Sequence, residues 1–217
     1  MKKTILSFAV LIVMMTACKK ETTVTTTQVA ADTTAVKDDV AEASAPMDSI
    51  SMMKAWEAYA TPGEAHKNLA MDNGTWHEES TMWMSPDDPK PMKMTMTAVS
   101  KMIMGGRYQE TRHRGTMEGQ PFEGVSTIGY DNASKEMVST WYDNMSTGIM
   151  YLTGKPEAGS KTTEFKGECT DPLTGKLKPI RETFTIVDAN TRKMEMFDVT
   201  PDGKEYKSME ITMTRKK

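Results

Sequence analysis

Residues 107–114 carry the side chains whose types and spacing in this sequence best suit binding chemistry. In an extended strand, successive side chains point to opposite faces, so Arg107 and His113 share one face while Glu110 and Arg112 share the other. One face of a strand in a closed sheet must look inward, so part of this charge is expected to be paired inside or to border a cavity. An arginine there would hold a carboxylate or phosphate through two hydrogen bonds. The alternative is a solvated outer face on which the charges pair with acidic neighbours.

A second group of polar and aromatic side chains lies near residue 140. Trp141 and Asp143 share one face of an extended segment with Met137. A carboxylate beside an indole on an inward face would orient the polar head of a ligand or pair with Arg107. The candidate ligand-binding residues are therefore Arg107, Arg112, His113, Met137, Trp141 and Asp143.

Motifs for nucleotide, metal and covalent chemistry are absent from the sequence. It has no P-loop, no dinucleotide fingerprint after a strand, no histidine pair at metal-ligand spacing and no G-x-S-x-G element. The formal net charge of −3 gives no electrostatic basis for binding nucleic acid. We predict no catalytic residue, no metal and no cofactor. An enzyme, as the alternative, would use His113, Asp143 or Glu110 as acid–base groups.

The chain contains 22 methionines, many of which recur at every second residue. These runs are Met82 and Met84; Met92, Met94 and Met96; Met102 and Met104; Met194 and Met196; and Met209, Ile211 and Met213. Alternation with polar residues is typical of strands buried on one face, so the methionines are expected to face the interior. Thioethers favour Cu(I), but no histidine accompanies these residues. The prediction is therefore a core, or the lining of an apolar cavity.

The elements that must position these residues are strands, which follow one another from Thr75 onward. The runs of ordinary strand length are 75–84, 92–101, 103–114, 120–130, 135–143, 147–153, 161–169, 177–187, 191–199 and 204–215. Short turns rich in Gly, Pro, Asp and Asn connect them. Adjacent hairpins form an up-and-down sheet, and closing that sheet removes its exposed edges. We therefore predict an all-β fold, a closed antiparallel up-and-down β-barrel of about ten strands with a short N-terminal helical segment.

Two helices are predicted before the strands. Residues 46–60 form an amphipathic pattern that Asp48 or a neighbouring serine can cap. The residues on its apolar face are Met52, Trp56 and Tyr59. Residues 61–64 then form a capping-box pattern with proline at the first helical position, which predicts a second helix over 62–71.

The first 17 residues have the pattern of a targeting segment. Two lysines precede an apolar run over 5–15 that is too short to span a bilayer as a stable helix. The following Met-Thr-Ala-Cys resembles the lipobox of bacterial lipoproteins, with Met15 in place of the usual leucine. The resemblance implies cleavage before Cys18 and a lipid anchor in the bacterial cell envelope, with the outer membrane as the expected partner. Ordinary signal cleavage that leaves a spare thiol is the alternative.

The remaining cysteine and the segment after Cys18 carry no chemistry of their own. With Cys18 lipidated, Cys169 has no partner for an intrachain disulfide and is expected to pack as a small hydrophobe. Low-complexity residues rich in Thr, Ala and Asp follow Cys18 and predict a disordered tether. The predicted domains are a signal peptide over 1–17, a tether over 18–45, a helix over 46–61 and a barrel over 62–217.

Two resemblances support the barrel. Gly74-Thr75-Trp76 resembles the G-x-W signature of the calycin group, which includes the lipocalins. In those barrels the tryptophan packs under a basic residue of the last strand, so the resemblance implies structural roles for Gly74, Trp76 and Arg215. The chain also resembles the bacterial DUF1579 family. The segments that carry this resemblance are EAHKNLAMDNGTW, IMGGRYQE, GQPFEGVSTIGYDNASKEMVSTWYDNMSTGIM, DPLTGK and PDGKEYKSMEITMTRK. That family implies a lipocalin-like barrel in secreted or envelope proteins, and no activity.

Three function classes follow from these observations. The favoured one is a non-enzymatic binder of a small apolar or amphipathic ligand, with its tail among the methionines and its head near residues 107–114. The second is an envelope enzyme, a hydrolase or an isomerase. The third is a structural or protein-interaction module with a solid methionine-rich core.

Overall fold

A computed structural model describes residues 48–217 of the chain. The predicted signal peptide, the lipidation site at Cys18 and the tether over 18–45 lie outside the described residues. The described part belongs to one compact unit. Within residues 48–217, no helix is both long and apolar enough to span a membrane.

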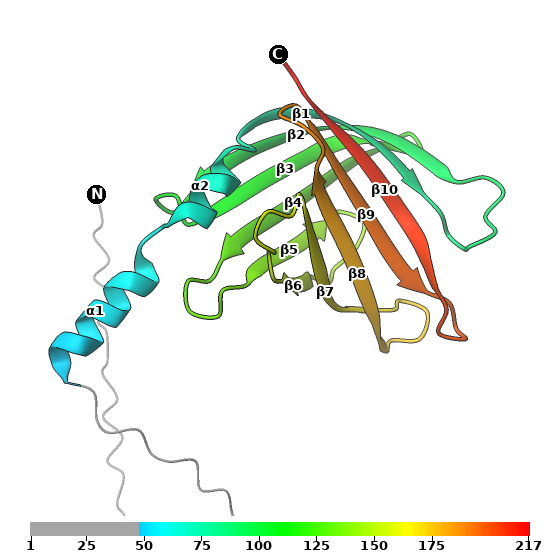
Figure 1. Ribbon diagram of the computed structural model, residues 1–217. Coiled ribbons are helices and arrows are strands. Elements are labelled where there is room, and N and C mark those ends of the chain that lie inside the picture. The colour runs from blue at the N-terminus through cyan, green and yellow to red at the C-terminus, as the bar shows by residue number, and fades with distance from the viewer. Residues whose placement is uncertain (1–47) are drawn as a thin grey trace, which may run out of the picture. The chain divides into compact units, whose positions relative to one another are not determined.

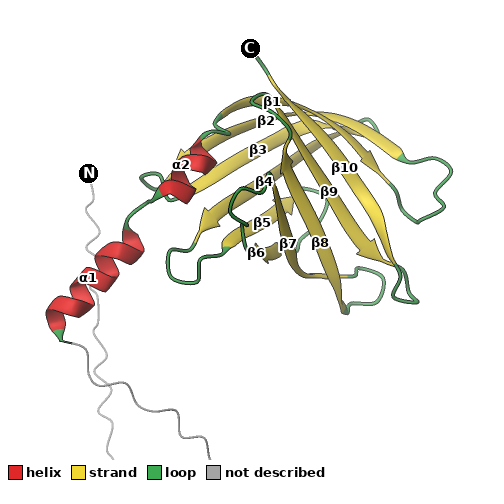
Figure 2. Ribbon diagram, in the orientation of Figure 1, coloured by secondary structure: helices red, strands yellow, loops and turns green. Residues whose placement is uncertain are grey.

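The predicted closed barrel is confirmed. Residues 74–215 form ten antiparallel strands, each paired with its neighbours in sequence, and the first strand pairs with the last (Figure 1, Figure 2). The strands are β1 Gly74–Met82, β2 Met92–Ile103, β3 Tyr108–Met117, β4 Gln120–Tyr130, β5 Met137–Asp143, β6 Met150–Gly154, β7 Thr162–Thr170, β8 Leu177–Ile186, β9 Thr191–Val199 and β10 Glu205–Arg215. Closure leaves no unpaired strand edge between β1 and β10.

Two helices precede the barrel within the described residues, α1 Ser49–Ala60 and α2 Glu64–Ala70. Asp48 caps α1, since its carboxylate accepts hydrogen bonds from the backbone N–H groups of Ile50 and Ser51. The apolar face predicted for this helix is present but uncovered, because no residue of α1 is buried. Trp56, for example, is 64% exposed.

The predicted capping box at the start of the second helix is wrong. Gly63, not Thr61, is the N-cap, and its backbone N–H donates to Nδ1 of His66 at 3.0 Å. The helix packs against β2, β3 and β4 at the end of the barrel where β1 begins (Figure 1). Its residue Leu69 is buried there, so α2 covers this end of the barrel.

The third strand begins later than predicted. The backbone of Met104, Gly105 and Gly106 has positive φ angles of 50°, 65° and 85°, a conformation that interrupts a strand. The chain therefore turns at 104–107 and resumes as β3 at Tyr108. Arg107 lies in this turn and not on a strand.

Most of the methionine runs face the interior as predicted. One buried cluster contains Met94, Met96, Phe122 and Ile211, with Met117, Trp141, Met194, Met209 and Met213 packed against it. The other contains Leu152, Phe165 and Ile180, with Met137, Met150, Cys169, Phe184 and Met196. Burial raises the pKa of the Cys169 thiol, in keeping with a packing role. Met84 and Met104 are exposed, against the prediction, because both lie beyond strand ends.

Candidate functional site

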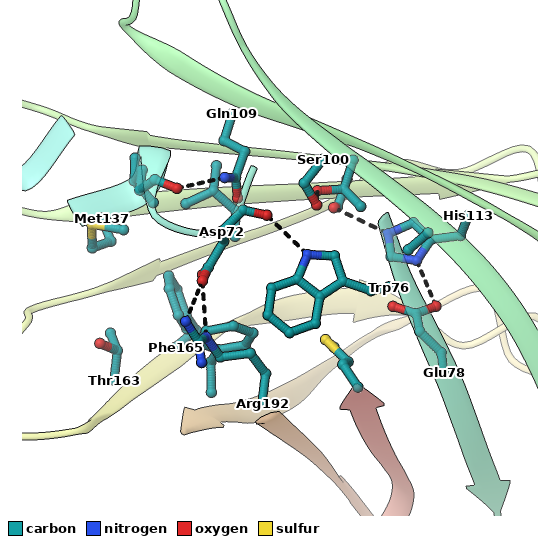
Figure 3. A pocket seen from close by; sticks show the side chains of 17 residues that line it. Asp72, Trp76, Glu78, Ser100, Gln109, His113, Met137, Thr163, Phe165 and Arg192 are labelled. Carbon is teal, nitrogen blue, oxygen red and sulfur yellow. Dashed lines mark hydrogen bonds and ion pairs between the residues drawn. The ribbon is translucent and has the colours of Figure 1, made fainter. Parts of the chain in front are cut away.

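Two adjoining cavities occupy the barrel interior described by the structure. The smaller, about 100 Å³, lies beneath α2, and polar side chains such as Glu78, Gln109 and His113 line it together with apolar ones (Figure 3). The larger, about 330 Å³, is lined mainly by methionine and aromatic side chains. They share the lining residues His113, Ser126, Ile128, Phe184 and Met213. A molecule with one polar and one apolar part would therefore meet both environments.

Trp76 lines the smaller cavity, and the guanidinium groups of two arginines lie near its indole ring. Its indole N–H donates to the carbonyl of Asp72 at 2.9 Å. The guanidinium of Arg215 lies 4.2 Å from the ring centroid and that of Arg192 lies 5.2 Å from it. Arg192 is itself buried and donates from Nε and Nη2 to Oδ1 of Asp72 at 2.9 Å and 2.6 Å. Figure 3 shows Arg192 beside Asp72 and Trp76.

His113 lines both cavities and is hydrogen-bonded to Glu78 and to Ser126. Its Nδ1 lies 2.9 Å from Oε2 of Glu78, and its Nε2 lies 3.3 Å from Oγ of Ser126 (Figure 3). A carboxylate at Glu78 requires Nδ1–H to donate. The side chain of Glu78 is 1% exposed, and its Oε1 has no hydrogen-bond partner among residues 48–217. A buried carboxylate oxygen without a donor is costly.

Three other polar side chains of the smaller cavity have hydrogen-bond partners. The hydroxyls of Ser100 and Thr111 lie 2.8 Å apart, and Nε2 of Gln109 donates to the carbonyl of Leu69 at 2.6 Å. The second contact ties β3 to α2. The unpaired oxygen of Glu78 is therefore an exception in its surroundings.

Trp141 and Asp143 line the larger cavity and bind each other. The indole N–H of Trp141 donates to Oδ2 of Asp143 at 2.7 Å, and the backbone N–H of Met145 donates to Oδ1 at 2.9 Å. The Trp141 ring lies against Gly124, where a Cβ atom would meet it at 2.5 Å, so this glycine makes room for the indole. Asp143 thus pairs with Trp141, and not with Arg107.

Glu182 lines the larger cavity from β8. It is half-buried, and it makes no hydrogen bond or ion pair with any residue in the described part of the chain. Phe184, Met194 and Met196 line the same cavity beside it. Burial raises the pKa of this carboxyl from 4.5 to about 7, since the apolar surroundings disfavour its charged form.

Arg107 and Arg112 do not face the interior, so the expectation of an inward arginine in this segment is wrong. Arg112 is exposed and donates from Nε to Oε1 of Glu110 at 2.9 Å. Arg107 is exposed in the turn, with Nη1 3.1 Å from the carbonyl of Met104. For Glu110 and Arg112 the alternative of a solvated, paired outer face is the one observed.

Four of the six candidates nevertheless border the cavities. His113 lines both, Trp141 and Asp143 line the larger and Met137 lines the smaller. Glu78, Glu182 and Arg192 were missed. Their inward orientation follows from alternation with neighbours that face the core, such as Trp76 for Glu78.

The ionisable side chains around the two cavities are mostly acidic. The acidic residues that line the cavities are Asp72, Glu78, Asp143 and Glu182, and the basic ones are Arg192 and His113. Asp72 forms an ion pair with Arg192. In the described region, no group of three or more His, Cys, Asp or Glu side chains is arranged to hold a metal ion. The interior therefore suits a neutral or positively charged ligand group better than an anion.

Glu78, His113 and Ser126 are hydrogen-bonded in the sequence carboxyl, imidazole, hydroxyl, as in the triad of a serine hydrolase. Acyl transfer also requires N–H donors aimed at the developing oxyanion. Ser126 lies within β4, paired with Thr111 of β3 and Trp141 of β5, so the ladder occupies the backbone around it. Glu110, an acid–base candidate in the enzyme alternative, lies on the outer face.

One solved structure resembles this fold, and one protein-family model matches the sequence. The structure is similar to the crystal structure of Rv2717c from M. tuberculosis, with a TM-score of 0.55 and 9% identity, over 72% of this chain and 100% of that chain. A redesigned β-barrel covers 69% of this chain and 95% of its own, at 14% identity and a TM-score of 0.37. No curated protein matches the chain in sequence. Residues 61–215, more than half of the sequence, match the family described as protein of unknown function (DUF1579), and the chain belongs to that family.

Proposed function

We propose that this protein binds one small apolar or amphipathic molecule inside its barrel and acts without catalysis. The observation that carries this proposal is the cavity of about 330 Å³ among the methionines, which shares His113 and Ser126 in its lining with the smaller cavity. Ligand cavities commonly measure about 300–1,000 Å³ and combine an apolar wall with a few polar groups. A solid methionine core, which the interaction-module alternative requires, would leave no such space.

Methionine side chains suit such a role because they are flexible and polarizable. The wall formed by Met94, Met96, Met194 and Met213 can adjust to ligands of different shape. The polar end, in contrast, is held rigid by hydrogen bonds from His113 to Glu78 and Ser126. The apolar body of a ligand would lie against the methionine wall, and its polar group would meet an ionisable side chain that lines the same interior.

The neutral probe N-phenyl-1-naphthylamine, whose fluorescence rises in apolar surroundings, is expected to bind the purified full-length protein. Ser139→Phe fills the larger cavity, because Ser139 is buried on its wall, and should weaken probe binding by about tenfold or more. Thr140→Phe adds the same ring on the next residue, whose side chain points to the other face of β5. Equal binding to both variants, each with an unchanged unfolding transition, would contradict an internal site.

We also propose that the barrel is lipid-anchored in the cell envelope. The support is the lipobox-like sequence that ends at Cys18, and acyl chains contribute about 0.8 kcal/mol per buried methylene to membrane binding. Metabolic labelling with palmitate is expected to mark the wild-type chain. A Cys18→Ala variant should carry no label, with Cys169→Ala as the matched control that stays labelled. Label retained by the Cys18 variant would exclude this attachment site.

A further inference from the structure

We propose that the ligand carries an amine on an apolar body, and that Glu182 receives this amine inside the methionine-lined cavity. The inference rests on the proposed function and specifies its ligand class. The charge of the ligand's polar group is then opposite to the one expected from the sequence, where an arginine of residues 107–114 would hold an anionic head.

The first support is the surroundings of Glu182. The residues in register beside it are Phe165 on β7 and Met196 on β9. On β8 itself, Ile180 and Phe184 point to the same side. None of these offers a hydrogen-bond donor from its side chain, so the carboxyl faces the cavity unpartnered. An ammonium or N–H donor from a ligand would supply the missing partner through a charge-assisted hydrogen bond.

The second support is that the nearby cations are already engaged. On β8, Lys178 donates to Asp198 of β9 at 2.5 Å. On β9, Arg192 is held by Asp72. On the neighbouring strand β7, Cys169 is not a cation, and its thiol packs in the core. No basic side chain of the described residues is therefore paired with Glu182.

The third support comes from the acids that line the same interior. Asp143 is bound by Trp141 and by the backbone of Met145. Oε2 of Glu78 is hydrogen-bonded to His113, while its buried Oε1 lacks a donor. A carboxylate or phosphate ligand would add a like charge to these groups, whereas an amine reduces the repulsion. The unsatisfied oxygen of Glu78 is an independent sign that the interior lacks donors.

Competition with N-phenyl-1-naphthylamine on the full-length protein tests the inference with three probes of one chain length, namely octylamine, octanol and octanoate. Near pH 8, octylamine should bind about tenfold or more tightly than octanoate, because only the amine gains a charge-assisted hydrogen bond. Octylamine binding should weaken as the pH falls from about 8 to about 5.5, since the pKa of Glu182 in the empty cavity is about 7 and its protonated form attracts a cation less.

Glu182→Gln is expected to abolish the preference for octylamine while octanol binds as before. The matched control is Glu168→Gln on the outer face of β7, where the side chain is exposed, and it should behave like the wild type. Octanoate binding as tightly as octylamine, or a preference lost in Glu78→Gln but kept in Glu182→Gln, would overturn the assignment. Failure of all probes, including octanol and the fluorophore, would instead reject the internal binding site itself.

Discussion

Trp76→Ala is expected to lower the free energy of unfolding by about 3–5 kcal/mol, the range for removing a large buried aromatic side chain. The indole is 3% exposed, and the guanidinium groups of Arg192 and Arg215 lie 5.2 Å and 4.2 Å from its ring centroid. Its removal opens a cavity at the covered end of the barrel and strips buried Arg192 of its aromatic contact. Urea denaturation followed by fluorescence or circular dichroism measures the loss.

A matched control for this change is Trp56→Ala on α1. Trp56 is 64% exposed, so the same truncation should change the free energy of unfolding by less than about 0.5 kcal/mol. If Trp76→Ala cost less than about 1 kcal/mol, the indole would not be part of the core. The structural role that the calycin resemblance implies for Trp76 would then be wrong.

The strand order was predictable because the sequence alternates clearly between core and solvent. In β2 and β10, Met94, Met96, Ile211 and Met213 alternate with threonine and charged residues. One-sided burial is the physical cause of such a period. With short turns between the runs, an up-and-down barrel follows directly. The ten strands observed over residues 74–215 agree with that prediction.

Predictions failed where geometry beyond local alternation decides the outcome. The alternation of Met102 and Met104 is that of a continuing strand, but the backbone turns at Gly105 and Gly106. At the second helix, the capping-box pattern pointed to Thr61, whereas the ring of His66 reaches the backbone N–H of Gly63. Several residues of this segment can cap the helix, and the pattern alone does not choose among them.

The inward face of β3 could not be chosen from its own sequence, because both faces carry charge. Pairing with β2 decides it: Ser100 and Ala98, both buried, lie opposite Thr111 and His113. Those residues therefore turn inward, and Arg112 turns outward. Register with a neighbouring strand is a non-local property, and it reversed the expected sign of the charge that faces a ligand.

The acidic residues of the interior were missed for a related reason. Glu78 lies in the segment His77–Ser80 and Glu182 follows Arg181, so each appears in sequence as part of an ordinary polar stretch. The hydrogen-bond partner of Glu78 is His113, 35 residues away. Glu182 shares its face with Ile180 and Phe184 on its own strand and with Phe165 and Met196 across the strands, whereas the residues next to it in sequence are polar. No local motif marks a lone carboxyl on an inward face.

Glu182→Met is expected to stabilise the empty protein at about pH 8 by up to about 3 kcal/mol, the free energy that corresponds to a pKa rise from 4.5 to about 7. A methionine would continue the wall formed by Met194 and Met196 and would remove a carboxylate from apolar surroundings. Replacing buried ionic groups by apolar residues of similar volume often stabilises proteins. The measurement is the free energy of unfolding in urea between about pH 4 and pH 8.

The pH dependence of this difference identifies its cause. Because the folded pKa of Glu182 lies above the unfolded value, the folded state binds more protons between about pH 4.5 and pH 7, and this group makes stability fall as pH rises through that window. Below it, Glu182 is protonated in both states, so wild type and variant should differ only by packing; above it, the difference stays at its maximum. Glu168→Met, on the exposed face of β7, should show no such window. A stabilisation independent of pH would mean that packing, and not the buried charge, separates the two proteins, and the carboxyl would then be no acceptor in need of a donor.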